Sequence, residues 1–241
     1  MIEAVRDGDV AVVTLRRPER RNALDIEHCD ALRAAVADAY DDGVRSIVIT
    51  GEGTSFCAGA DLTGVYGEEF RSSLYAALAA VRDTPVPVVA AVNGPAIGAG
   101  TQLAIACDLR VAAETAVFGV PTARNGLAVD VWTIRRLTEL CGGAVARSVM
   151  IGCDIVPAAD ARTSGLSDRD GGFDVALAWA HELATLAPLT LAYNKLVLNT
   201  PDADPQDERL RAAFDACWAS SDIEEARKAR AEKRVPVFRG R

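Results

Sequence analysis

The sequence predicts an α/β protein in which strands and helices alternate through the first half of the chain. Two short segments rich in β-branched residues, 9–15 and 44–50, end at turn-forming residues and are typical of strands. Between them, apolar residues recur every three or four positions, which is typical of a helix with one buried face. Because strand–helix–strand units connect with a right-handed crossover, we expect these strands to be parallel.

The remaining elements follow from periodicity and from Gly and Pro breaks. Asp25 is a predicted N-cap for the first helix. A second cycle contains a helix at 70–81, a strand at 88–92 and a helix that opens at 97–100, before a strand at 109–111. The rest of the chain is predicted to be mostly helical, with segments at 130–140, 143–151, 173–186, 188–198, 208–220 and 223–233.

Composition narrows the classes of function. The chain has 241 residues, 50% of them hydrophobic, and a net charge of -8, which argues against nucleic-acid binding because such binding needs a basic surface. Its six cysteines are scattered without a CxxC pair or a metal-ligand spacing, so we expect no metal and a reducing cytoplasmic location. The sequence shows no signal peptide and no apolar run long enough for a membrane span.

Two segments of small residues are the strongest functional signal. The first is Ser-Phe-Cys-Ala-Gly-Ala-Asp-Leu at 55–62, and the second, at 92–104, contains Ile-Gly-Ala-Gly where a helix opens. Main-chain amides at such a helix start are uncovered, and the helix dipole adds partial positive charge. Two fixed N–H donors would stabilise negative charge on a carbonyl oxygen. A Gly-Ala-Gly triplet alone could simply permit tight helix packing, but the presence of the other segment, 55–62, favours an oxyanion site.

Together with segments 17–24 and 118–121, these motifs resemble the crotonase superfamily, the enoyl-CoA hydratase/isomerase family, over about residues 12–238. The resemblance implies a spiral of repeated ββα units, with a core at 1–187 and a C-terminal helical trimerisation region at 188–241. It implies an acyl-CoA thioester as ligand or substrate, with no other cofactor, and a role in fatty-acid metabolism. Matched to the family motifs, Ala60 and Ala99 are the two oxyanion donors.

The same resemblance suggests the residues that bind CoA and the acyl chain. The backbone near Ala23 and Leu24 would meet the nucleotide end, and Arg20 or Arg21 would contact a phosphate, although solvated surface arginines are an equal alternative. Asp61 is interpreted as a structural cap for the turn that holds Ala60. Trp132 could line the acyl pocket or belong to the core. The other predicted pocket residues are Ala58, Leu62, Ile97, Gly100, Pro121 and Leu127.

The positions at which hydratases of this family carry two glutamates are occupied here by Gln102 and Thr122. An amide and an unactivated hydroxyl cannot act as carboxylates. Since each general acid or base contributes about 10² to 10⁴ in rate, we expect weak or absent hydration. Asp130 lies eight residues after Thr122, where the dehalogenase branch of the family has its nucleophile. It is therefore either a nucleophile or base, or the N-cap of the next helix, and the cap is favoured.

The segment 232–241 resembles the closing segment of the family, in which C-terminal helices pack across subunits. The resemblance implies a homotrimer or a hexamer built from two trimers, with Lys233 and Phe238 near a neighbour's CoA pocket; a frayed basic tail is the alternative. Two hypotheses remain. The protein either binds an acyl-CoA and passes it to other lipid-metabolism enzymes, or it is an active hydratase, isomerase or thioester hydrolase that uses Asp130.

Overall fold

The computed structural model describes residues 1–61 and 67–241. A six-stranded sheet with the order β1-β2-β3-β4-β6-β9 forms the centre. The strands β2, β3, β4, β6 and β9 are parallel, which confirms the predicted parallel order. The antiparallel hairpin of β1 with β2 was not predicted. The strands are β1 (Ile2–Asp7), β2 (Val10–Leu15), β3 (Ser46–Gly51), β4 (Val88–Val92), β6 (Leu109–Ala112) and β9 (Arg169–Asp170).

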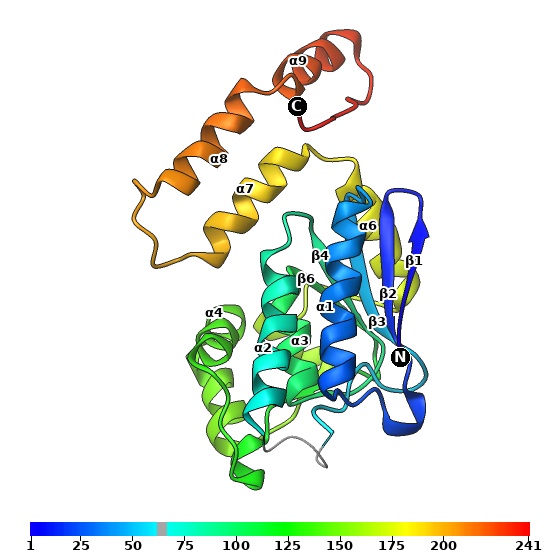
Figure 1. Ribbon diagram of the computed structural model, residues 1–241, viewed down its shortest axis with the longest axis vertical. Coiled ribbons are helices and arrows are strands. Elements are labelled where there is room, and N and C mark those ends of the chain that lie inside the picture. The colour runs from blue at the N-terminus through cyan, green and yellow to red at the C-terminus, as the bar shows by residue number, and fades with distance from the viewer. Residues whose placement is uncertain (62–66) are drawn as a thin grey trace.

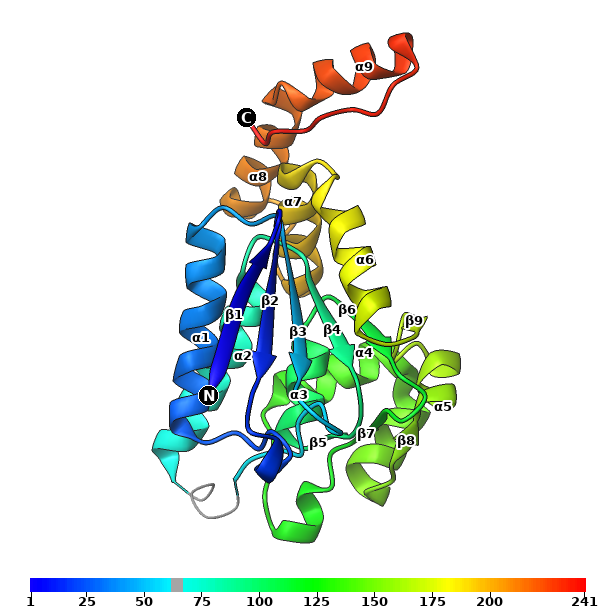
Figure 2. The same ribbon diagram turned by 90° about the vertical axis from the view of Figure 1, so that its right-hand side faces the viewer.

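Helices cover both faces of this sheet, as Figure 2 shows. On one face lie α1 (Ile26–Asp41), α2 (Glu68–Asp83) and α3 (Ala99–Ala106), and on the other lies α6 (Phe173–Ala184). Strand β3 divides its side chains between them, because Ile47 and Ile49 join the α1–α3 core while Val48 packs with α6. The predicted cap of α1 is confirmed, since the Asp25 carboxylate accepts a hydrogen bond from the His28 N–H at 2.9 Å.

The region after β6 contains the two helices predicted at 130–140 and 143–151, together with short elements that were not predicted. Both helices lie within α4 (Val131–Arg147), which is broken at Gly142, where φ is 74° and ψ is 161°, and a π-helical turn follows at Ser148–Gly152. A second, three-stranded sheet is formed by β5 (Ala96–Ile97), β7 (Val117–Gly119) and β8 (Val156–Pro157). Its strands and α5 (Ala158–Ser164) were missed because segments this short carry little periodicity.

The C-terminal helices α7 (Pro188–Asn199), α8 (Glu208–Ala219) and α9 (Asp222–Glu232) extend from one end of the molecule, beside the amino ends of the parallel strands (Figure 1). No single described helix is long and apolar enough to cross a membrane, although α6 and α7, bent by 112°, satisfy the length and composition test as a pair. The division of the chain into a core and a C-terminal region at residue 188 stays a prediction.

A buried ion pair fastens α7 to the core. The Lys195 ammonium donates to the Asp108 carboxylate at 2.7 Å and to the Val86 carbonyl at 3.0 Å, and the Lys195 side chain is only 7% exposed. Burial raises the pKa of Asp108, while Lys195 acts in the opposite direction. The carboxylate therefore depends on its partner for compensation.

We expect Lys195→Met to lower the free energy of unfolding by about 3 to 5 kcal/mol, because it leaves a buried carboxylate without its cation. Urea denaturation monitored by circular dichroism measures the loss. Replacing Asp108 with Asn in the same chain should recover part of it. Arg135→Met is the matched control, since the Arg135–Asp202 pair is exposed and should contribute less than about 1 kcal/mol. Equal losses in the buried and exposed variants would contradict this account.

Candidate functional site

The two glycine-rich segments predicted as half-sites lie side by side at the carboxyl ends of β3 and β4. Cys57 pairs with Ala96 in an isolated parallel bridge. In this bridge the Cys57 N–H donates to the Pro95 carbonyl at 3.1 Å, and the Ile97 N–H donates to the Cys57 carbonyl at 2.9 Å. The backbone of 57–60 therefore runs beside the segment that leads into α3.

Glycine is required where these segments meet. Gly59 and Gly98 have φ values of 113° and 55°, which residues with a Cβ rarely adopt. A Cβ on Gly100 would lie 2.0 Å from the Cys57 carbonyl oxygen, inside any allowed contact. The small residues are thus explained by the close approach of the two backbones.

The amides of Ala60 and Ala99 are two of the main-chain donors at this junction for which the described residues provide no acceptor. Leu24 bonds on either side of Ala60, donating to the Gly59 carbonyl at 2.8 Å and accepting from the Asp61 N–H at 2.7 Å. Because N–H groups alternate in direction along an extended chain, the Ala60 N–H points away from Leu24. Ala99 is the first residue of α3, where helix N–H groups have no partner within the helix. Neither amide donates to a residue in the described ranges.

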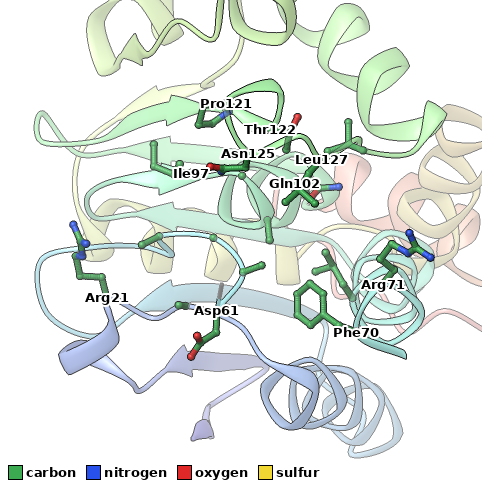
Figure 3. Close-up of a pocket in the computed structure, with 18 of the residues that line it drawn as sticks. Arg21, Asp61, Phe70, Arg71, Ile97, Gln102, Pro121, Thr122, Asn125 and Leu127 are labelled. Carbon is green, nitrogen blue, oxygen red and sulfur yellow. The ribbon is translucent and has the colours of Figure 1, made fainter. Parts of the chain in front are cut away.

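Both amides border a cavity of about 510 Å³ (Figure 3). Among the predicted residues, those that line it are Arg20, Arg21, Ala23, Ala58, Ala60, Asp61, Ile97, Ala99, Gln102, Pro121, Thr122 and Leu127. Arg21 and Arg71 lie toward opposite ends of the view, with Asp61, Ile97 and Gln102 between them. The sequence indicated that the helix after Asp61 shapes the pocket but did not identify its residues. The wall residues from α2 and from the segment before α4 are Phe70, Arg71, Leu74, Tyr75, Ala128 and Val129.

Several predicted residues lie outside this lining. Leu24 is 1% exposed and sits behind Ala60, and Gly100 faces the Cys57 carbonyl. Trp132 points away from the cavity and stacks under the Arg82 guanidinium, 5.4 Å from the ring centroid, beside a different cleft. Lys233, which ends α9, belongs to the other end of the molecule (Figure 1).

Phe238 also lies outside the cavity lining. Phe238 lies in the tail after α9, where its carbonyl accepts a hydrogen bond from Arg45 at 2.7 Å. The predicted approach of Lys233 and Phe238 to a neighbouring subunit stays a prediction. Leu62 falls outside the described residues.

Asp130 is the N-cap of α4. Its carboxylate accepts from the Thr133 N–H at 3.3 Å and from the Thr133 hydroxyl. Since that hydroxyl donates its hydrogen bond to Asp130, it accepts the hydrogen bond from Gln102, whose Nε2 lies 2.9 Å away. The Gln102 amide, 3% exposed, is thereby oriented with Nε2 toward α4.

Tyr75 of α2 completes a closed ring of hydrogen bonds. Its hydroxyl interacts with the Asp130 backbone N–H and with the Gln102 side chain. Burial, followed by the charge of Asp130, raises the pKa of Tyr75, while its hydrogen bonds with Asp130 and Gln102 act in the opposite direction, so the phenol is protonated at neutral pH. The Gln102 side chain therefore has hydrogen-bond partners within the protein, Thr133 and Tyr75.

Other reactive groups near the site are inert or occupied. Burial raises the pKa of Cys57 to about 12, so its thiol is not a nucleophile at neutral pH. His28 lies between Asp25, at 2.6 Å from Nδ1, and the Met1 amine, at 2.7 Å from Nε2, on α1 outside the cavity lining. Arg20 and Arg21 border the cavity, and their guanidinium groups form no ion pair with any residue in 1–61 or 67–241.

The parallel sheet with helices on both faces, and the glycine-rich loops that meet at the carboxyl edge of its strands, define an α/β protein with a candidate ligand site at that edge. The family model for enoyl-CoA hydratase/isomerase matches residues 6–241, and the chain belongs to this family.

It is 44% identical, over the whole of both chains, to a Mycobacterium tuberculosis (strain CDC 1551 / Oshkosh) protein named probable enoyl-CoA hydratase echA6. Among solved structures, it is similar to an enoyl-CoA hydratase from Polaromonas sp. JS666, with a TM-score of 0.90, 32% identity and 99% of each chain covered. An enoyl-CoA hydratase/isomerase family protein from Hyphomonas neptunium also has a TM-score of 0.90, at 30% identity over 100% of this chain and 98% of the other.

Gly100→Ala tests the close approach of the two segments. We expect it to destabilise the protein by at least about 2 kcal/mol, because the new methyl group forces α3 away from the Cys57 carbonyl. Gly143→Ala, in α4 with open space around it, is the control and should be neutral or stabilising by up to about 1 kcal/mol. Urea unfolding compares the two variants, and the same sign for both would refute the explanation.

Proposed function

We propose that this protein binds acyl-CoA thioesters of fatty-acid metabolism and hydrates them weakly or not at all. The observation that carries the proposal is the pair of amides at Ala60 and Ala99, which border the cavity and donate to no acceptor within 1–61 or 67–241. A thioester oxygen placed between them would receive two hydrogen bonds in a site with little water. The thioester is the ligand, and no further cofactor is proposed.

The two ends of the cavity suit the two ends of such a ligand. The exposed guanidinium groups of Arg20 and Arg21 supply positive charge for the phosphates of CoA. Toward α2, the side chains of Phe70, Leu74 and Leu127 offer an apolar surface for the acyl chain. Favourable burial of methylene groups would add about 0.8 kcal/mol each.

Neither of the two positions that carry a glutamate in hydratases of the family has a carboxylate here. Gln102 is a neutral amide that is already bonded to Thr133 and Tyr75, and Thr122 offers only a hydroxyl. Polarisation of the carbonyl without an acid or base would stabilise a bound thioester more than it would accelerate addition of water. A bound acyl-CoA could then be passed to, or withheld from, other enzymes of lipid metabolism.

The alternative is an active hydratase, isomerase or thioester hydrolase in which Asp130 is the base or nucleophile. Asp130 borders the site through Tyr75, which favours a role there. Its carboxylate, however, already accepts the two bonds that cap α4, and it is absent from the cavity lining. We therefore favour binding over turnover.

We also propose a homotrimer, or a hexamer of two trimers, built through the C-terminal helices. The apolar side chains of Leu198, Phe214 and Trp218 are 63%, 45% and 68% exposed on α7 and α8. Association would bury them. Lys233 and Phe238 would then be free to approach the pocket of a neighbour.

The binding hypothesis predicts saturable binding of octanoyl-CoA in calorimetry, with crotonyl-CoA hydration at least about 10³-fold slower than in a hydratase that keeps both glutamates. Loss of absorbance of the enoyl thioester measures hydration. Rapid turnover that disappears in Asp130→Asn would instead support the enzyme hypothesis. Tight binding and slow hydration that both persist in Asp130→Asn would support the binding hypothesis.

Trp218→Glu is expected to shift the protein from a trimer or hexamer to smaller species, because it places a charge in the proposed apolar interface. Size-exclusion chromatography with light scattering gives the mass of each species. The control is Val5→Glu on the edge strand β1, which is 54% exposed and distant from α8. A wild-type monomer at micromolar concentration would refute the proposed assembly.

A further inference from the structure

Arg17 holds three acceptors from two separate segments of the chain. Its Nη1 donates to the Ala23 carbonyl at 3.2 Å and to the Asp25 carboxylate at 3.1 Å. Its Nη2 lies 3.0 Å from the Asp61 carboxylate. The side chains of Arg17 and Asp61 are only 19% and 12% exposed, so these contacts are largely shielded from water.

These acceptors surround the backbone bridge between Leu24 and Ala60. Ala23 and Asp25 are the residues before and after Leu24, and Asp61 is the residue after Ala60. A single planar guanidinium therefore ties both strands of the bridge together immediately beside the Ala60 amide. Its donors point in fixed directions, which makes the arrangement specific in angle as well as distance.

The base of Arg17 is itself fixed. Its N–H donates to Asn22 Oδ1 at 2.9 Å, and the Asn22 side chain, 1% exposed, donates to the carbonyls of Glu52 at 2.9 Å and Ser55 at 2.8 Å. The backbone from which the Arg17 side chain extends is therefore held in place, and the guanidinium has a fixed position relative to Asp61.

We infer that Arg17 is a positioning residue that directs the Ala60 amide at the thioester oxygen. This inference rests on the proposed function, in which Ala60 and Ala99 bind that oxygen. Ala99 is held by α3 itself, whereas Ala60 lies in a loop whose alignment depends on the bridge to Leu24. Loss of the Arg17 contacts would rotate this loop and weaken one of the two hydrogen bonds, while the surface that binds CoA through Arg20 and Arg21 would persist.

The test is difference infrared spectroscopy of octanoyl-CoA carrying ¹³C at the thioester carbonyl. Hydrogen bonds to the oxygen lower the C=O stretching frequency, so the shift on binding reports the amides directly. We expect a downward shift in the wild type and about half of it in Arg17→Gln and in Asp61→Asn. Affinity for octanoyl-CoA should fall about fivefold, the worth of one net hydrogen bond, while affinity for free CoA changes less than about twofold.

Arg16→Gln is the matched control, because Arg16 pairs with Glu3 and Glu52 at the sheet edge and is 42% exposed. It should keep the full infrared shift. Arg17→Lys should restore only part of it, since an ammonium cannot reproduce the directions of a guanidinium.

The outcomes separate the two levels of the proposal. Absence of a shift in the wild type with octanoyl-CoA bound would overturn the proposed role of the amides themselves. A wild-type shift retained in full by Asp61→Asn and a folded Arg17→Gln would overturn only the role of Arg17. If Arg17→Gln does not fold, Asp61→Asn decides, because it leaves the Arg17 contacts to 23 and 25 in place. Equal loss of free CoA binding would also overturn positioning, by revealing a general structural defect.

Discussion

The backbone contact between Cys57 and the start of α3 is the constraint on which the site depends. The hydrogen bonds of Cys57 to Pro95 and Ile97 bring together two loops that are about forty residues apart in sequence. They can meet because β3 and β4 are adjacent parallel strands, whose following loops emerge at the same edge. Because Gly100 packs directly against the Cys57 carbonyl, the first turn of α3 is held in position, and the Ala99 amide is held with it.

The loops of the pocket could be predicted from sequence residue by residue, but the side chains of its helical wall could not. Clustered glycines indicate that two backbones approach closely, so the glycines of segments 55–62 and 92–104 predicted that these loops meet. The α2 residues Phe70 and Leu74 have ordinary core spacing, and only packing decides that their face borders a cavity. Trp132 shows the same limit, because its neighbours Asp130 and Thr133 face Gln102 while Trp132 turns toward Arg82.

The sequence left Asp130 with two roles, and the ring of hydrogen bonds explains why they compete. A carboxylate that accepts an N–H and a hydroxyl from Thr133 has its charge stabilised where it is. Reaction at a thioester would require it to release the start of α4 and the Thr133 proton that orients Gln102. Breaking one hydrogen bond of this network would also weaken the others, because each side chain would lose a partner. The ring therefore favours a fixed pocket wall over a mobile acid.

Charge is divided within the short segment that carries Arg17, Arg20 and Arg21. Arg17 is paired with the carboxylates of Asp25 and Asp61, so its charge stabilises the backbone of these two segments. Arg20 and Arg21 border the cavity, and their charge is available to an anionic ligand. A chain with a net charge of -8 can in this way attract CoA phosphates, because electrostatic attraction at close range depends on the nearest groups and the distant charges are screened within about 10 Å. In the proposed complex, this segment would serve both ends of the ligand, because Arg20 and Arg21 would bind the nucleotide while Arg17 would align the Ala60 amide.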